Sequence, residues 1–173
     1  MRSFIIITLL SVLVVGFVSA GIVYTVTVSL TTQIQVPNII FVSGEDTSTI
    51  GGTIGQNGTT FTATTVPLSV GANVTIGQAV RLNNTDTSAH NVTGAEVLSE
   101  DFGTELNKLS IYLSDGSTSY LLISLDTAGT ATYEFTGNIT IPAATAYNII
   151  IEGYYDDGTA SGTSNTLSFN IKQ

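Results

Sequence analysis

Apolar and polar side chains alternate along residues 22–36. Apolar residues fill every even position except Thr32, while Thr, Ser and Gln fill most odd positions. A period of two is typical of a β-strand with one buried face, whereas a helix would scatter the hydroxyl residues around its circumference. The apolar even positions are Ile22, Tyr24, Val26, Val28, Leu30, Ile34 and Val36. Because Pro37 closes the run, the pattern predicts one strand over residues 21–36.

The length of this strand sets it apart. At about 3.3 Å per residue it spans roughly 50 Å, whereas a typical strand has about 5–6 residues. Such a strand must either bend across two sheets or extend beyond its own domain. The sequence therefore predicts an N-terminal strand that is longer than a strand paired within one sheet of its own domain.

Shorter alternating runs follow at regular intervals. They lie at residues 74–82, 109–113, 120–125, 133–141, 147–155 and 167–171, with turn signals at Asp115-Gly116 and at residues 126–129. The alternation breaks near Gly77, which predicts a β-bulge. Only residues 99–106 favour a turn or two of helix. The pattern predicts an all-β domain over residues 37–173, an antiparallel β-sandwich of the jelly-roll-like kind.

The first twenty residues are typical of a secretory signal peptide. Arg2 supplies a minimal basic region, residues 4–18 are apolar, and Val18-Ser19-Ala20 is a small-residue cleavage site. Cleavage after Ala20 would release a secreted protein that meets the membrane only through the signal segment. A retained helix is the competing interpretation, because apolar residues continue towards Leu30 and a membrane span needs about 20 of them.

The composition of the chain argues against several classes of function. Charged residues make up 10% of the chain, the net charge is −9 and cysteine is absent. A surface of this sign repels nucleic acid, and no disulfide or thiolate chemistry is available. His90 is the single histidine, and no G-x-S-x-G turn accompanies any serine. The acidic clusters do not follow the spacing of a calcium-binding loop; they are Glu45 with Asp46, Glu100 with Asp101 and Glu105, and Asp156 with Asp157. We expect no catalytic residue, no metal ligand set and no cofactor, and therefore not an enzyme.

N-x-S/T sequons offer sites for N-glycans, which would solubilise a surface poor in charge. They occur at Asn57, Asn73, Asn83, Asn91 and Asn138. The sequence favours Asn57, Asn83 and Asn91, because these lie in polar, loop-like contexts.

The layout of the whole chain resembles a known group. A signal peptide ending at Ala20-Gly21, the strand Ile22-Val23-Tyr24-Thr25-Val26-Thr27-Val28 and the segment VTIGQAVRLNNTDTSAHNVT (residues 74–93) are similar to archaeal bundling pilins and thread subunits, relatives of the TasA/camelysin-type biofilm fibre proteins. The resemblance implies an extracellular pilus or thread, a homopolymeric filament with a role in adhesion and biofilm. The chain departs from the bacterial members in having no evident metal-ligand motif.

The resemblance also implies head-to-tail assembly by donor-strand complementation, in which the N-terminal strand (residues 21–36) of one subunit completes the sheet of the next. The donor face comprises Ile22, Tyr24, Val26, Val28 and Leu30. We expect the strand to cross between subunits at Thr32, the polar position on the apolar face.

Two other interpretations stay open. One is a type IV pilin-like filament subunit whose N-terminal hydrophobic helix is retained, although no basic-Gly processing site precedes the apolar run. The other is a membrane-anchored surface or carbohydrate-binding β-sandwich domain, with sugars stacked on tyrosines; the candidates are Tyr120, Tyr147, Tyr154 and Tyr155.

Overall fold

The computed structural model describes residues 25–34, 38–102, 106–127, 129–156 and 164–173. The described chain is built from β-strands and one short 3-10 turn, η1 (Gln56–Gly58), so the all-β prediction is confirmed. The strands are β1 (Thr25–Ile34), β2 (Ile39–Ser43), β3 (Gly52–Ile54), β4 (Thr60–Val70), β5 (Val74–Asn84), β6 (His90–Asp101), β7 (Leu106–Ser114), β8 (Ser119–Leu125), β9 (Ala131–Glu134), β10 (Thr136–Ile141), β11 (Ala146–Tyr155) and β12 (Ser164–Lys172).

The strands form one mixed 12-stranded sheet in the order β10-β6-β12-β1-β4-β11-β7-β8-β9. β5 pairs with β11 and β2, and β3 pairs with β4, off this path. The predicted pair of antiparallel, jelly-roll-like sheets is not confirmed, because β1 pairs with β12 in parallel and β11 meets β4 in parallel. Strands joined by a tight turn pair antiparallel. β1 and β12 lie far apart in the sequence, so no turn constrains their direction.

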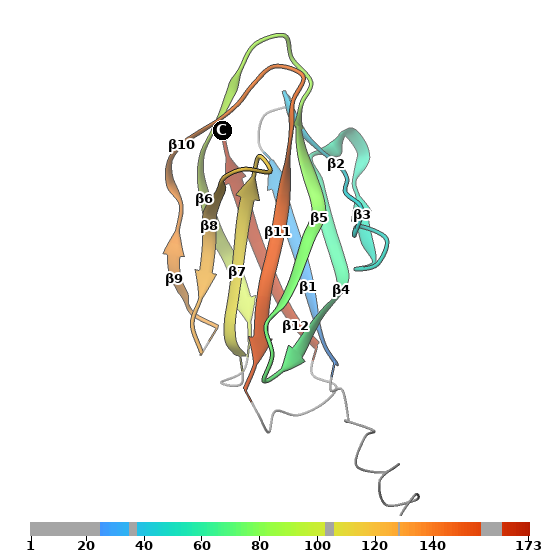
Figure 1. Ribbon diagram of the computed structural model, residues 1–173, viewed down its shortest axis with the longest axis vertical. Helices are drawn as coiled ribbons and strands as arrows, with labels where there is room; N and C mark the ends of the chain where they lie inside the picture. Colours follow the sequence, from blue (N-terminus) through green and yellow to red (C-terminus); the bar gives the residue numbers. More distant parts are fainter. Residues whose placement is uncertain (1–24, 35–37, 103–105, 128, 157–163) are drawn as a thin grey trace, which may run out of the picture.

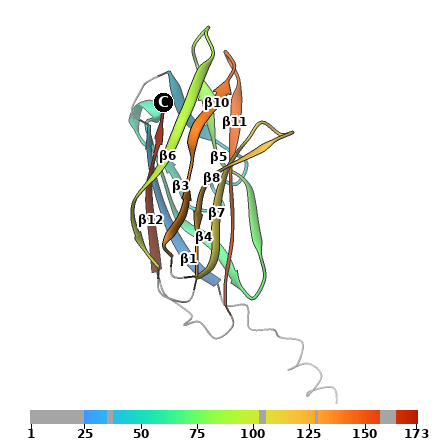
Figure 2. The same ribbon diagram turned by 90° about the vertical axis from the view of Figure 1, so that its left-hand side faces the viewer.

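The sheet curls until its two edges nearly meet, as Figure 2 shows. β9 lies at one edge and β10 at the other, and Phe135 joins them in the sequence. The Phe135 N–H donates to the carbonyl of Leu122 on β8 (2.8 Å), and its carbonyl accepts from Ala95 N–H on β6 (3.0 Å). A single residue therefore bridges both edges, and the sheet is a nearly closed barrel.

The barrel has two distinct ends in Figure 1. At the upper end lie the chain carboxyl terminus, the β5–β6 loop at residues 85–89 and the β10–β11 turn at residues 142–145. At the lower end lie the start of β1 and the β4–β5 turn at residues 71–73, whose Gly71 N–H donates to the carbonyl of Tyr155 (2.7 Å). The two chain termini of the described fold thus lie at opposite ends.

The interior is filled by one face of each long strand. In β11 buried and half-buried residues alternate along the whole strand, with Tyr147, Ile149, Ile151, Gly153 and Tyr155 inside. This is the period of two expected for a sheet with one face on the core. The largest fully buried side chains outside β11 include Leu30, Phe41, Leu68 and Phe169, so β1, β2, β4 and β12 share that core.

Several local predictions are confirmed. Asp115 accepts from the N–H groups of Ser117 and Thr118 (2.7 Å each), and Gly116 has φ 93°, so the β7–β8 hairpin turns there. The predicted bulge is also present, because residues 77–79 of β5 lie between the pairs Ile76–Ile151 and Val80–Ile149. The helical turn favoured for residues 99–106 is wrong at its start, where residues 99–101 continue β6 along β12.

Candidate subunit interface: the β1 slot

β1 lies in the middle of the sheet although it is the first strand of the described fold (Figure 1). Its register with parallel β12 runs from Thr27↔Ser164 to Ile34↔Ile171. Its register with antiparallel β4 runs from Thr25↔Ser69 to Gln33↔Thr60, with a shift between Val28 and Leu30. We call the facing edges of β4 and β12 the β1 slot. The alternation in the sequence predicted both strands, but it did not indicate that β12 would be the neighbour of β1.

The predicted donor residues lie partly within and partly outside the described residues. Leu30 is 2% exposed in the core of its own chain, and the pairs on both sides of Thr32 belong to this same chain. In this single chain both edges of the strand are paired through Thr32, and the predicted crossing at that residue, with Leu30 in a neighbour, stays a prediction. Backbone register places Val26 opposite Leu68 and Val28 opposite Val66. The signal peptide, Ile22 and Tyr24 lie outside the described residues.

Thr32 is the one weak point of the seated strand that the structure identifies. Its side chain is 1% exposed, and its hydroxyl has no hydrogen-bond partner in the described structure. A buried hydroxyl without a partner costs about 1–3 kcal/mol relative to one that water solvates. β1 is therefore paired along both edges of its slot, but the buried hydroxyl of Thr32 lowers the stability of this packing.

Residues 35–38, which we call the link, join β1, which ends at the upper end, to β2, which begins there. The carbonyl of Asn38 accepts from the Thr85 N–H (3.0 Å) and from its hydroxyl (3.3 Å). Asn84, fully buried, donates from its side-chain amide to the carbonyls of Ser88 (2.8 Å), Ile141 (3.0 Å) and Pro142 (3.1 Å). The two bonds from Thr85 hold Asn38, the last residue of the link, against the β5–β6 loop. The bonds from Asn84 join that loop to the β10–β11 turn.

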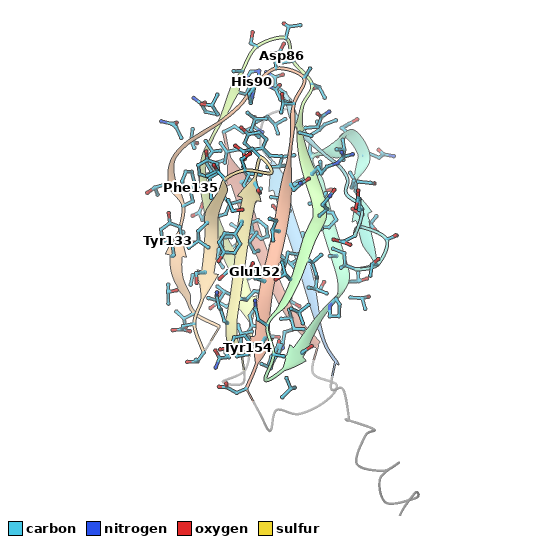
Figure 3. All side chains as sticks on the ribbon, viewed as in Figure 1. Asp86, His90, Tyr133, Phe135, Glu152 and Tyr154 are labelled. Atoms are coloured by element: carbon cyan, nitrogen blue, oxygen red, sulfur yellow. The ribbon has the colours of Figure 1, made fainter. Side chains whose placement is uncertain are left out.

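The single histidine lies next to the β5–β6 loop, at the start of β6 (Figure 3). His90 Nε2 lies 2.8 Å from Asp86 Oδ2, and Asp86 Oδ1 accepts from the Thr87 N–H (2.6 Å). The hydrogen bond from His90, followed by that from Thr87, holds the pKa of Asp86 below its usual value. The His90 ring is thus hydrogen-bonded to Asp86 of the neighbouring loop.

The sequons occupy different settings. Asn57, Asn73, Asn91 and Asn138 are exposed, whereas Asn83 is half-buried between Ile40 and Ala146. Asn57 lies in η1 with φ 67°, and Asn73 lies in the β4–β5 turn. Asn91 and Asn138 lie close together, because Thr140, which completes the Asn138 sequon, donates to Asn91 Oδ1 (2.8 Å).

Two of the four candidate tyrosines lie inside the barrel, whereas Tyr120 and Tyr154 are half-buried. Tyr147 and Tyr155 are buried, and Tyr147 donates to the carbonyl of Thr140 (3.1 Å), so neither can present a face to a sugar. Burial, with the Asp115 carboxylate as a smaller cause, raises the pKa of Tyr147. Asp46 Oδ2 accepts from the Gln78 N–H of the bulge (3.0 Å). Within the described ranges, no three His, Asp or Glu side chains cluster closely enough to hold a metal ion.

Comparison with models of known protein families and with curated proteins finds no match for this chain. Within the part of the chain that the structure describes, no helix has the length and hydropathy needed to cross a membrane.

Proposed function

We propose that this chain is a structural subunit of an extracellular filament, a pilus or thread, in which β1 of one subunit fills the β1 slot of the next. The observation that supports this is the position of β1. It is the first strand of the described fold, it lies between two strands that it does not adjoin in sequence, and only residues 35–38 tie it to the rest of the domain. The same strand from another copy can therefore fill the slot without changing any other connection.

The energetic balance favours such an exchange at high local concentration. A seated and an exchanged β1 make the same contacts in the slot, so their free energies differ mainly through the link and through the concentration of subunits. An empty slot is costly, because it exposes the edges of β4 and β12 and the cavity left by Leu30, a side chain whose burial contributes about 1.5–3 kcal/mol. A subunit with an open slot is therefore driven to accept a strand.

The proposal places the protein outside the cell, after cleavage at Ala20, with identical subunits as partners. The proposed N-glycans at exposed sequons would solubilise a surface with only 10% charged residues. Because one subunit gives a strand and the next receives it, the contact is heterologous and propagates. Adhesion and biofilm formation are the roles that such a filament would serve.

A designed disulfide distinguishes a seated strand from an exchanged one. Thr31 on β1 lies opposite Thr62 on β4, and both are half-buried. Opposite residues in antiparallel strands lie within the span of a disulfide. In the double variant Thr31→Cys/Thr62→Cys, oxidation of assembled material should link successive subunits and give a ladder of covalent multimers on a non-reducing denaturing gel. The chain has no other cysteine to confuse the result.

The matched control is Ser114→Cys/Ser119→Cys, a pair that closes the β7–β8 hairpin and can form only within one chain. It should run as a monomer under the same oxidation. If the Thr31/Thr62 variant also runs only as a monomer while filaments are present, β1 stays in its own slot and the exchange mechanism is wrong.

One observation favours a second candidate. β1 completes the sheet of its own chain from Thr25 onward, so contacts between subunits or with a membrane can instead be made by the apolar residues before it. In that case the protein is a pilin-like or membrane-anchored surface domain with a retained N-terminal segment. N-terminal sequencing of purified native protein separates the two: a start at Gly21 supports secretion with cleavage, and a start within residues 1–8 supports retention.

A further inference from the structure

We infer that exchange of β1 brings the upper ends of two subunits together, so that the contact surface between copies is the upper end of the barrel. This inference rests on the proposed function, since it concerns how an exchanged strand must run. Its basis is the direction of β1, the length of the link and the distribution of charge.

Strand direction fixes which ends meet. β1 runs parallel to β12, and its last residue, Ile34, aligns with Ile171 close to the carboxyl terminus at the upper end. β2 begins at the same end, where Ile39 pairs with Asn84. In an accepting subunit the exchanged strand keeps this direction, so Ile34 again lies at the upper end. The link therefore leaves the upper end of the donor and enters the upper end of the acceptor.

The link is too short to reach any other part of the acceptor. From Ile34 to Ile39 an extended chain spans at most about 18 Å. The link is not easily lengthened by peeling β2 from its place, because Ile39 is fully buried and Asn38 is bonded to Thr85. A span of this size is far below the length of the barrel, given that β1 alone extends about 33 Å at 3.3 Å per residue. The two upper ends must therefore lie close together.

The charge distribution agrees with this orientation. Acidic residues gather at the lower end, where strands β6, β8 and β11 finish, with Lys108 on β7 as the cation nearby; these residues are Glu100, Asp101, Asp126 and Asp156. Two lower ends would repel each other over about a Debye length, roughly 8–10 Å at physiological salt. At the upper end Asp86 is paired with His90. The exposed residues beside this pair are small and uncharged, namely Thr85, Thr87, Ser88, Ala89, Pro142 and Ala144.

Single-cysteine variants test which ends meet. Ala89 lies in the upper β5–β6 loop, Ala72 lies in the lower β4–β5 turn, and both are exposed. Ala89→Cys and Ala72→Cys are the same substitution at opposite ends of a chain that has no cysteine. We expect a short bis-maleimide to link Ala89→Cys filaments into covalent dimers at several times the yield from Ala72→Cys filaments.

The outcomes separate this inference from the proposed function. The Thr31→Cys/Thr62→Cys ladder reports exchange itself. If the ladder forms but Ala72→Cys links as well as Ala89→Cys, or neither links, exchange stands and the upper-end contact is overturned. If the ladder is absent, the proposed exchange fails and the upper-end contact fails with it. If both tests succeed but the disulfide-linked products of Thr31→Cys/Thr62→Cys stop at dimers, exchange closes into pairs, which supports the upper-end contact and contradicts the filament.

Discussion

β1 and β11 both lie inside the sheet, yet the chain holds them very differently. β11 is continuous with the chain at both ends, pairs with β5, β4 and β7, and buries Tyr147, Ile149 and Ile151 on one face. Its buried hydroxyls have partners: Tyr147 donates to Thr140, and Tyr155 accepts from Asn165. β1 is tethered only through residues 35–38, and the hydroxyl of its buried Thr32 has no hydrogen-bond partner in the described structure.

The difference shows that burial alone does not decide whether a strand belongs permanently to its own chain. Leu30 on β1 is as well buried as Ile151 on β11, at 2% and 1% exposure. The two strands differ in how many connections join them to other described strands, and in whether their buried hydroxyls have hydrogen-bond partners in the described structure. A strand joined to described strands at both ends can come from another copy only if two connections pass between the copies, whereas the first strand of the described fold needs only the link.

The largest expected effect contrasts an aspartate in each strand. A buried, unpaired carboxylate costs several kcal/mol, so Leu30→Asp should unseat β1 and Ile151→Asp should unfold the domain. Mixed with wild-type protein, Leu30→Asp subunits can accept a strand but cannot donate one. They should shorten filaments in proportion to their fraction, as measured by electron microscopy. Ile151→Asp subunits cannot fold and should leave filament length unchanged.

A control for that experiment is Leu98→Asp, because Leu98 is 53% exposed on β6 and its substitution should change stability by less than about 0.5 kcal/mol. If Leu30→Asp subunits assemble normally with wild type, β1 is not the donor.

The same contrast explains what the sequence could predict. The strict alternation in β11 reflects a strand with one face on the core, and hairpin turns such as Asp115-Gly116 carry their own local signal. The alternation of β1 was equally clear, and Leu30 and Thr32 on its even-numbered face are both buried. These features depend on the residues of the strand itself.

Partners of strands could not be predicted, because pairing depends on residues far away in the sequence. Nothing local in residues 164–172 indicates a parallel neighbour at β1, and nothing in β9 or β10 indicates that Phe135 bridges two edges. Of the adjacent amides Asn83 and Asn84, the sequence drew attention to the sequon at Asn83. The buried amide is that of Asn84, and its role depends on the carbonyls of Ile141 and Pro142, which it donates to and which lie far away in the sequence.

A smaller effect is expected at the hydrogen bond between the side chains of Tyr155 on β11 and Asn165 on β12. Tyr155 is fully buried and its hydroxyl accepts from the side-chain amide of Asn165, itself 6% exposed. Tyr155→Phe removes this acceptor from a buried amide and should lower the free energy of unfolding by about 1–3 kcal/mol in urea. Tyr154→Phe, at the half-buried neighbouring position, is the matched control and should change it little. Equal losses in the two variants would argue against the hydrogen bond as the cause.

In β1 the corresponding change should stabilise the protein. Thr32→Val replaces a buried hydroxyl that has no partner in the described structure by a methyl group of similar shape, so unfolding should cost about 1 kcal/mol more. Thr31→Val, on the half-buried opposite face, serves as the control and should raise the free energy of unfolding by less. A loss of stability in Thr32→Val would show that the hydroxyl does find a partner, and the contrast with β11 would weaken.

The smallest effect concerns the β5–β6 loop, which contacts Asn38 at the end of the link between β1 and β2. The pKa of Asp86 is lowered in the folded state, so its charged form stabilises the fold above the ordinary value of 3.8, and that stabilisation is lost as the pH falls through the lower folded pKa. Asp86→Asn keeps an acceptor for the Thr87 N–H but removes the charge that faces His90. Urea unfolding of both proteins from neutral pH down to about pH 2 should therefore show wild type as the more stable near neutrality, with the difference vanishing in acid. Because Asp86 is exposed, the difference should be small. A difference that persists unchanged at the lowest pH would mean that the carboxylate does not secure the loop through its charge.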